Sequence, residues 1–281
     1  MNWTMAERQQ AMARYFQQTV FYWREIYDRQ TVFAEIYRRR HQTAVQMLDE
    51  LRLPRNIRAL DAGCGPGLMT LELTRRGYAV AAVDAVAEML RRTRRAALQA
   101  GASERVLASM SDVGNLDFKH EVFHLATVIG VTEWLPSLQR PLRELARVLK
   151  PGGYLIISAD NTWALNQLLD PLLLPVLKPC KHLAGRVLRG LGARRPELRV
   201  RAYSIREFDA ALSHAGFSKV RGCTLGFGPF TLFGRPILSE AAGLRLDARL
   251  QTMAEKSGRL HIGTALAGLG SVYVTLARKT A

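Results

Sequence analysis

Residues 61–67 carry the clearest chemistry in the sequence, because they read Asp-Ala-Gly-Cys-Gly-Pro-Gly. Three glycines at alternate positions follow an acid that ends a short, mostly apolar run at 57–61. Glycine has no Cβ and tolerates positive φ, so such a loop turns sharply and lies close against a ligand. A pyrophosphate loop has the different spacing Gly-x-Gly-x-x-Gly. The acid beside these glycines favours a ligand that carries positive charge.

Further polar residues stand where later strands are predicted to end. Asp84 follows the apolar run at 79–83, and Ser111 and Asp112 follow a weaker strand at 106–109. Glu133 lies in the loop after a buried strand at 122–129. Open α/β sheets bind ligands outside the carboxyl ends of their strands. We therefore expect these residues to surround one site together with the glycine loop.

In this order and spacing, the motifs resemble those of class I S-adenosylmethionine (SAM)-dependent methyltransferases over roughly residues 55–160. SAM carries an amino group and a sulfonium charge and no phosphate, which suits the acid of the loop. The resemblance implies that Asp84 accepts hydrogen bonds from both ribose hydroxyls, because a carboxylate is a bidentate acceptor. It implies no metal. The cofactor-binding residues implied are Asp61, Gly63, Cys64, Gly65, Gly67, Asp84, Ala85, Ser111, Asp112, Val113 and Ile129.

Each acid also has a purely structural interpretation. Asp61 could be a helix cap, Asp84 an ordinary acid at a strand end, and Asp112 a loop acid. Their joint occurrence at these spacings favours the cofactor site. The chain departs from the family at His124, because the family commonly has Asp just before the fourth strand. That position is usually structural, so the departure leaves the cofactor assignment intact.

The acceptor side is predicted from aromatic residues. The amino-terminal order Tyr-Phe-x4-Phe-x-Trp-x2-Ile-Tyr resembles the opening of magnesium-protoporphyrin O-methyltransferases, whose helical arm covers the acceptor. That family has His in the loop after the fourth strand, where this chain has Trp134, so we carry over only the arm and not tetrapyrrole activity. Core packing is the competing interpretation of the aromatics. The predicted acceptor-binding residues are Tyr15, Tyr22, Tyr27 and Trp134.

Methyl transfer to oxygen asks little of the protein beyond holding the nucleophile in line and excluding water. A general base helps where the acceptor is a hydroxyl of high pKa. Glu133 is the first candidate for a polar site residue, and His41 is the second. His41 follows Arg38-Arg39-Arg40, so a surface position is its alternative.

Strands and helices alternate from residue 57 to 158, which predicts a parallel sheet with helices on both faces. We expect an α/β, Rossmann-like, seven-stranded methyltransferase sheet with an antiparallel last strand, an N-terminal helical arm and a helical lid insertion. A turn is predicted at Pro151-Gly152-Gly153 and a capping box at Ser204 and Glu207. The predicted division is a helical arm at 1–54, a SAM-binding core at 55–160, a basic helical lid at 161–203, and the rest of the core at 204–281.

The chain of 281 residues has a formal net charge of +16, part of it concentrated near residues 178–206. A solvated lid, an anionic membrane surface or lipid substrate, and an acidic partner such as RNA or carrier-protein phosphopantetheine all suit this segment. Nucleic acid is disfavoured because no stacking pattern or RNA-binding module accompanies the charge. Arginine-rich composition on a solvated surface is the general alternative. The oligomeric state stays open.

No secretion signal or bilayer-spanning run is recognisable, and the three cysteines are far apart in sequence. We expect a cytoplasmic protein, with peripheral contact at the inner membrane surface as the alternative that the basic segment offers. The predicted function is SAM-dependent O-methylation of a hydrophobic small molecule, natural-product, quinone or lipid-like. Carboxylate or carbon methylation of a tetrapyrrole-like or carrier-bound acceptor is one alternative, and a non-catalytic SAM-binding protein is another.

Overall fold

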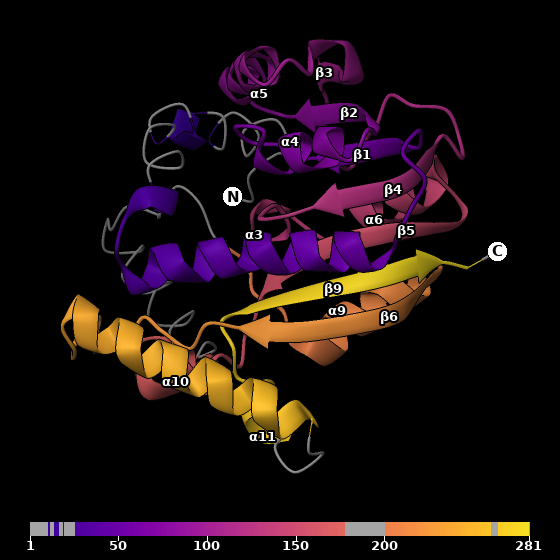
Figure 1. Ribbon diagram of the computed structural model, residues 1–281. Coiled ribbons are helices and arrows are strands. Elements are labelled where there is room, and N and C mark those ends of the chain that lie inside the picture. Colours follow the sequence, from indigo (N-terminus) through magenta and orange to yellow (C-terminus); the bar gives the residue numbers. More distant parts are fainter. Residues whose placement is uncertain are drawn as a thin grey trace, which may run out of the picture.

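A mixed sheet of seven strands forms the centre of the molecule in the computed structural model (Figure 1). The structure describes residues 11, 14–16, 19, 26–177, 200–259 and 264–280, without the side chains of 257–259 and 264–265. The strand order is β3-β2-β1-β4-β5-β9-β6, and only β9 runs antiparallel to its neighbours. The strands are β1 (Arg58–Ala62), β2 (Ala79–Asp84), β3 (Val106–Met110), β4 (Phe123–Val128), β5 (Leu149–Asp160), β6 (Phe217–Leu225) and β9 (Val272–Lys279). The predicted sheet is confirmed.

Helices cover both faces of the sheet, as Figure 1 shows. α3 (Val32–Glu50), α4 (Leu68–Arg75) and α5 (Ala87–Gln99) lie on one face, and α6 (Gln139–Val148) and α9 (Ile205–His214) lie on the other. Each face therefore has its own apolar core. Met47 and Leu73 pack with Leu125 on the first face, whereas Leu142 and Phe208 belong to the second. Such double coverage explains why the central strands are apolar at nearly every position.

Two helix starts follow directly from local sequence. The hydroxyl of Thr31 accepts a hydrogen bond from the backbone N–H of Ala34 and begins α3. The predicted capping box of α9 is confirmed, since Ser204 Oγ accepts from Glu207 N–H at 3.2 Å and Glu207 Oε2 accepts from Ser204 N–H at 3.0 Å. Each cap satisfies backbone N–H groups that the helix itself leaves unpaired.

Two local predictions were wrong, and a third is only partly covered by the described residues. The arm is not one helix up to residue 50, because a short 3-10 turn η1 (Ile26–Asp28) precedes a break at 29–31. Pro151-Gly152-Gly153 is not a turn before the fifth strand but lies inside β5, where the register with β4 shifts between Phe123 and Leu125. The described start of the lid holds only α7 (Leu165–Leu169) and the 3-10 turn η4 (Pro175–Leu177). Most of the basic segment, residues 178–199, lies outside the described residues.

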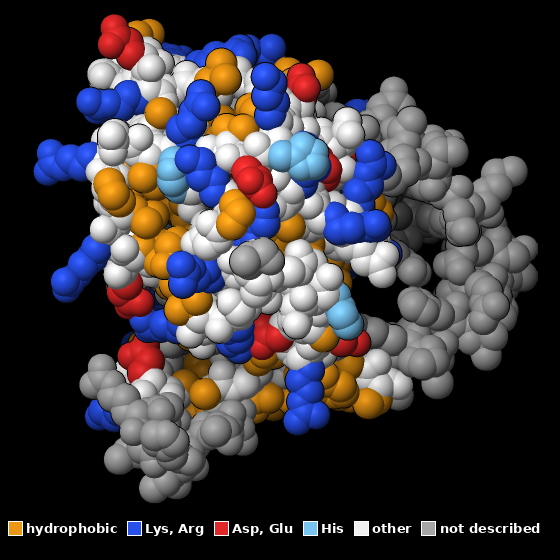
Figure 2. Space-filling view, turned by 90° about the vertical axis from the view of Figure 1, so that its right-hand side faces the viewer, with side chains coloured by type: hydrophobic (Ala, Val, Ile, Leu, Met, Phe, Trp, Pro, Cys, Tyr) orange, Lys and Arg blue, Asp and Glu red, His pale blue; other side chains and the backbone are white. Residues whose placement is uncertain are grey.

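Smaller elements complete the fold. A hairpin of β7 (Thr231–Leu232) and β8 (Arg235–Pro236), which the sequence did not predict, precedes α10 (Glu240–Arg259) and α11 (Thr264–Ala267). The 3-10 turns η2 (Ser103–Arg105) and η3 (Thr132–Trp134) lie in loops. No helix among the residues described combines the length and apolar character needed to cross a bilayer. Figure 2 shows the end of the sheet where the parallel strands begin, with Lys and Arg side chains spread widely over it.

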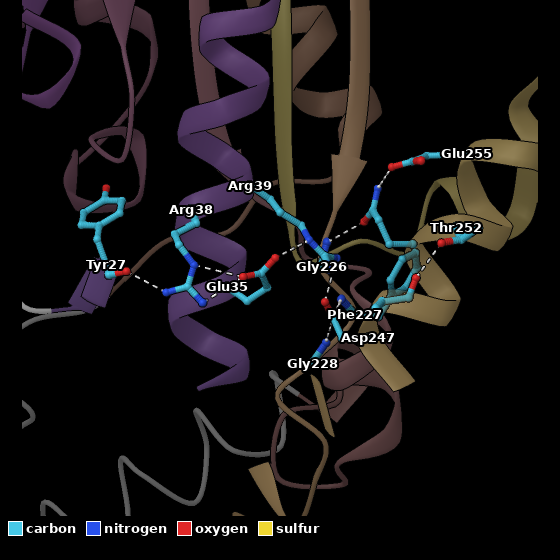
Figure 3. Close-up of polar contacts among 12 residues, drawn as sticks. Tyr27, Glu35, Arg38, Arg39, Gly226, Phe227, Gly228, Asp247, Thr252 and Glu255 are labelled. Carbon is cyan, nitrogen blue, oxygen red and sulfur yellow. Dashed lines mark hydrogen bonds and ion pairs between the residues drawn. The ribbon is translucent and has the colours of Figure 1, made fainter. Parts of the chain in front are cut away.

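One buried carboxylate ties α10 to α3 and to the loop after β6 (Figure 3). Asp247 of α10 is fully buried and lies 2.8 Å from Nη1 of Arg39 on α3. The same carboxylate accepts from the backbone N–H groups of Phe227 at 2.6 Å and Gly228 at 3.3 Å. Glu35 holds the Arg39 guanidinium from the other side at 3.0 Å. This network fixes the loop after β6, which forms one wall of the second cavity described below.

Candidate active site: a cofactor cavity and a second cavity

The glycine loop turns sharply where β1 ends. Gly63 and Gly65 have φ of 75° and 53°, and the N–H groups of Gly63 and Cys64 both donate to the carbonyl of Val83 on the neighbouring strand. A Cβ on Gly63 would lie 2.3 Å from a methyl carbon of Val131, whereas a Cβ on Gly65 would meet no protein atom within 4 Å. The loop therefore packs tightly at Gly63 and leaves open space at Gly65, as expected of a loop that lies against a ligand.

Asp61 is fixed beneath this loop. Its two carboxylate oxygens accept from the hydroxyls of Thr70, at 2.6 Å, and Thr127, at 2.9 Å. Burial, together with the nearby charge of Asp84, raises the pKa of Asp61 to about 6, although the two hydroxyl donors act to lower it. The group is therefore mostly ionised at neutral pH. It places a buried negative charge beside the cavity.

Asp84 ends β2 and closes the same loop. Its Oδ2 accepts from Gly65 N–H and its Oδ1 from Val86 N–H, both at 2.9 Å. Burial raises the pKa of Asp84, while these backbone donors act to lower it. Each carboxylate oxygen has a second lone pair, so two hydroxyl groups of a ligand can still be accepted.

These residues line a cavity of about 500 Å³. Ten of the eleven predicted cofactor residues border it: Asp61, Gly63, Cys64, Gly65, Asp84, Ala85, Ser111, Asp112, Val113 and Ile129. Gly67 does not, since it caps α4 with φ of 96° and packs against Thr93. The thiol of Cys64 lies 3.5 Å from the Thr93 hydroxyl, and burial raises its pKa well above the usual range. Asp112 accepts from Gly114 N–H and so shapes its own turn.

A second cavity of about 500 Å³ adjoins the first at Trp134, which lines both. The rings of Tyr15 and Phe16 pack against Trp134 at centroid distances of 5.3 and 5.0 Å. Tyr15 borders the second cavity and Phe16 the first. The rest of the second cavity is lined by Thr19, Phe33, Ile36, Tyr37, Glu133, Asp160, Asn166, Gln167, Val200, Gly228, Pro229, Ser271 and Val272.

An ion pair lies between the two cavities. Arg40 and Glu133 are 5% and 3% exposed, and Arg40 Nη1 lies 3.4 Å from Glu133 Oε1. Arg40 borders the first cavity and Glu133 the second. The guanidinium lies 4.2 Å from the ring centroid of Tyr37. A Cβ on Gly130 would lie 2.6 Å from Arg40 Nη2, so the absent side chain of this glycine lets the guanidinium approach the loop after β4.

Two carboxyl groups in this region, those of Glu133 and Asp160, have raised pKa values. Burial raises the pKa of Glu133, against the lowering effect of Arg40. Burial and then the charge of Glu133 raise the pKa of Asp160, at the end of β5, to about 7. Among the described residues, Glu133 Oε2 and Arg40 Nε are buried without a hydrogen-bond partner. Such atoms mark places where a ligand or water completes a polar cluster.

His41 and Tyr27 lie on the cofactor side. Both border the first cavity, and their rings meet at a centroid distance of 6.5 Å. Burial lowers the pKa of His41, so its imidazole is neutral at neutral pH. The two predicted polar candidates, Glu133 and His41, are thus separated, because each borders a different cavity. Tyr22 lies outside the described residues.

The sequence matches the family described as methyltransferase domain over residues 60–157. The chain therefore contains a class I SAM-dependent methyltransferase domain.

Individual relatives are similar to part of the chain rather than to all of it. The malonyl-(acyl-carrier protein) O-methyltransferase of Enterobacter lignolyticus (strain SCF1) is 37% identical over 121 residues, which are 41% of this chain and 46% of that protein. The demethylmenaquinone methyltransferase of Mycobacterium bovis (strain BCG / Pasteur 1173P2) is 32% identical over 112 residues, 40% and 44% of the two chains. The match thus spans about half the length of these relatives or less.

Solved structures show the same fold beyond the matched segment. The structure of a 1,6-didemethyltoxoflavin-N1-methyltransferase from Burkholderia thailandensis, with bound 1,6-didemethyltoxoflavin and S-adenosylhomocysteine, aligns with a TM-score of 0.59. The alignment covers 100% of this chain and 92% of that one at 18% identity. The resemblance of the arm to magnesium-protoporphyrin O-methyltransferases is not shown by these comparisons and stays a prediction.

Residues outside the methyltransferase motifs were missed by sequence reasoning. Arg40 lies in a run of three arginines that looks like a surface charge cluster, and only its burial in the structure distinguishes it. Asp160 lies two residues beyond the predicted end of the fifth strand. Its position at the carboxyl end of a central strand was the signal that could have found it.

Proposed function

We propose that the chain transfers a methyl group from SAM to an oxygen atom of a small hydrophobic acceptor held in the second cavity. One observation carries the proposal: the cavity of the glycine loop and the second cavity share Trp134 as a common wall. Methyl transfer needs donor and acceptor in line and shielded from water. Two adjoining cavities of this size give each reactant its own place.

The lining of the first cavity suits each part of SAM. The open space at Gly65 admits the ligand close to the backbone, and the carboxylate of Asp84 suits the ribose hydroxyls. The buried charge of Asp61 suits the cationic methionine end. Arg40, whose Nε has no hydrogen-bond partner among the residues described, suits the carboxylate of that end. SAM supplies an electrophilic methyl group, and these residues bind and orient it.

The second cavity supports a hydrophobic acceptor. Phe33, Ile36, Trp134, Pro229 and Val272 give it apolar walls, and its polar groups gather near Glu133 and Asp160. The comparisons do not fix the methylated atom, because the similar proteins include an O-methyltransferase and an N1-methyltransferase by name. We keep oxygen as the proposal and carboxylate or carbon as the alternatives. We also retain as a proposal the division of the chain into a helical arm (1–54), a SAM-binding core (55–160), a basic lid (161–203) and the rest of the core (204–281).

The direct test is calorimetry with SAM, S-adenosylhomocysteine and NAD. We expect micromolar-range affinity, about −8 kcal/mol, for the first two and none for NAD. Release of S-adenosylhomocysteine on addition of hydrophobic phenols and alcohols then tests catalysis. Binding of NAD without SAM would contradict the cofactor assignment. Tight SAM binding without turnover of any acceptor class would favour the non-catalytic alternative.

An exposed apolar surface supports peripheral membrane contact as an additional proposal. Leu172 and Phe233 are 54% and 62% exposed, and Asp170 joins their segments by accepting from the Thr231 hydroxyl and the Gly234 N–H. Further exposed apolar residues of these segments are Leu169, Leu173, Val176, Leu232, Ile237 and Leu238. Apolar residues on a basic protein suit an anionic bilayer.

Sedimentation with phosphatidylcholine vesicles, with and without phosphatidylglycerol, tests this contact. We expect salt-sensitive binding to the anionic vesicles. Replacing Leu172 and Phe233 with serine should weaken binding, and so should replacing Arg186, Arg189, Arg194 and Arg195 with glutamine. SAM affinity should be unchanged in both variants. Leu107→Ser, on the far edge strand and 64% exposed, is the control. Equal sedimentation of wild type with both kinds of vesicle would mean that the basic segment near residues 178–206 is only a solvated lid.

A further inference from the structure

Two carboxyl groups from different elements line the second cavity. Glu133 follows β4 in η3, Asp160 ends β5, and both line this cavity. Backbone contacts hold them in place, because Glu133 C=O accepts from Arg201 N–H and Asp160 C=O accepts from Tyr203 N–H. The backbone that carries each carboxyl group is thus anchored to residues 201–203.

One carboxylate oxygen of Glu133 is an unused hydrogen-bond acceptor. Glu133 Oε1 faces Arg40, while Glu133 Oε2 is buried with no hydrogen-bond donor among the residues described. An unsatisfied buried oxygen costs about 1–3 kcal/mol, and more where it is charged. A ligand that brings a hydrogen-bond donor into the second cavity removes that cost. A ligand that brings a carboxylate increases it.

The charges around Glu133 and Asp160 also favour a ligand that donates a hydrogen bond over one that carries a carboxylate. Among the residues that the structure describes, Arg40 is the cation whose charge acts on both Glu133 and Asp160, so two carboxyl groups share one guanidinium. Of the described titratable groups, the phenol of Tyr37 also faces them from α3, Tyr27 lies beside Tyr37 and Arg40, and Tyr15 borders the same cavity. Burial raises the pKa of both carboxyl groups, with Asp160 at about 7. Near neutral pH, Asp160 is therefore able both to take up and to release a proton.

We propose that the acceptor enters the second cavity through a hydroxyl group, and that Asp160 takes the proton of this hydroxyl during methyl transfer. This inference rests on the proposed function. The O–H bond of the acceptor breaks and its proton binds to the Asp160 carboxylate. The oxygen forms the bond to the methyl carbon while the C–S bond of the sulfonium breaks, and that electron pair stays on sulfur. Asp160 then releases the proton to water.

In this arrangement Glu133 and Arg40 are positioning residues. Glu133 accepts a hydrogen bond from the acceptor, and Arg40 holds Glu133 in place and prevents both carboxyl groups from protonating together. The cluster also sets specificity, because an acceptor carboxylate would be repelled by at least one ionised side chain. The structure thus assigns hydroxyl acceptors, and not carboxylates, to this cavity.

Equilibrium binding of 2-naphthol and 2-naphthoate to the S-adenosylhomocysteine-loaded protein tests the inference, since these probes share one ring system. At about pH 8, wild type should bind naphthol at least about tenfold more tightly than naphthoate, and naphthoate should gain affinity as pH falls through about 7. Asp160→Asn should reduce the preference to about threefold or less and remove its pH dependence. Glu104→Gln, an exposed acid outside both cavities, should behave as wild type.

Turnover of naphthol separates the roles further. Its kcat should rise with pH to a plateau above about 7 in wild type, and Asp160→Asn should lower kcat by about 100-fold with little change in KM, because general-base catalysis contributes 10²–10⁴-fold. Glu133→Gln should raise KM more than it lowers kcat. Equal binding of the two probes, binding of neither, or an unchanged pH profile in Asp160→Asn overturns the inference. Failure of S-adenosylhomocysteine to bind overturns the proposed function instead, and the probes are then compared without it.

Discussion

The two cavities are built in different ways. The cofactor cavity depends on short contiguous stretches, residues 61–67, 84–86 and 111–114, each at the end of one parallel strand. The second cavity is assembled from α3, η3, the end of β5 and the loop before α10, which lie far apart in sequence. The glycine loop brings backbone groups to the first cavity, whereas the second cavity has no such contiguous loop among the residues described. Cofactor binding is therefore set by local sequence, whereas the acceptor is set by tertiary packing.

The largest expected effect comes from replacing Asp247, which supports the second cavity and whose contacts are drawn in Figure 3. Removing one partner of a buried ion pair costs about 3–5 kcal/mol. Asp247→Ala leaves Arg39 and the N–H groups of Phe227 and Gly228 without their shared acceptor. We expect the free energy of unfolding to fall by that amount, measured in urea. S-adenosylhomocysteine affinity should be retained where the variant is folded, while naphthol binding is lost.

An exposed ion pair gives the matched control for Asp247. Glu50 of α3 and Arg221 of β6 pair at the surface, and both side chains are 50% exposed. Like the Asp247 network, this pair connects α3 to a more distant part of the chain. Exposed pairs contribute about 0–1 kcal/mol, so Glu50→Ala should change stability little. Similar losses in the two variants would mean that burial does not distinguish these pairs. Loss of cofactor binding in folded Asp247→Ala would mean that the two cavities are not independent.

The largest loss of cofactor binding is expected from a substitution at Gly65. A side chain there points into open space that borders the cavity, and the φ of 53° adds backbone strain. We expect Gly65→Val to lower SAM affinity by more than about 100-fold, which is about 2.7 kcal/mol. Gly101 has φ of 63° and equally open surroundings at the end of α5, away from the cavity. Gly101→Val should therefore carry similar strain and bind SAM normally in calorimetry.

The same contrast explains what the sequence could predict. Residues 61–67 and Asp84 were found because glycine and acid types at fixed local spacing follow directly from the chemistry of the loop. Arg40 could not be found in this way, because residues 38–40 are all arginine and only packing against Gly130 and Tyr37 buries the third of them. The sheet followed from the alternation of strands and helices. The bulge that keeps β5 continuous through Gly152 depends on register with β4, which no local pattern contains.

Asp84 gives a finer test of the cofactor cavity. A hydrogen bond to a charged group contributes about 1.5–3 kcal/mol, so Asp84→Ala should weaken SAM binding by about 10- to 150-fold. Because Asp84 also holds Gly65 and Val86, affinity alone does not separate recognition from loop support. Wild type should prefer adenosine to 2′-deoxyadenosine, and the variant should not. An unchanged preference would make Asp84 an ordinary strand-end acid.

The smallest expected effect compares the buried carboxyl groups of the two cavities through pH. Asp61 is compensated by two hydroxyl donors, whereas Asp160 shares one guanidinium with Glu133. The folded-state pKa of Asp160, about 7, lies above its ordinary value of 3.8, so its contribution to stability is present below about pH 4 and is lost as pH rises through 7. Asp160→Asn removes that loss. We expect its Tm to match wild type at about pH 4 and to exceed it by at least roughly 2–4 °C at about pH 8. Asp61 shifts stability in the same direction in both proteins, so the difference between them isolates Asp160. Glu104→Gln should show no such pH dependence, and a Tm gain in Asp160→Asn that is equal at both pH values would mean that Asp160 does not titrate in this range.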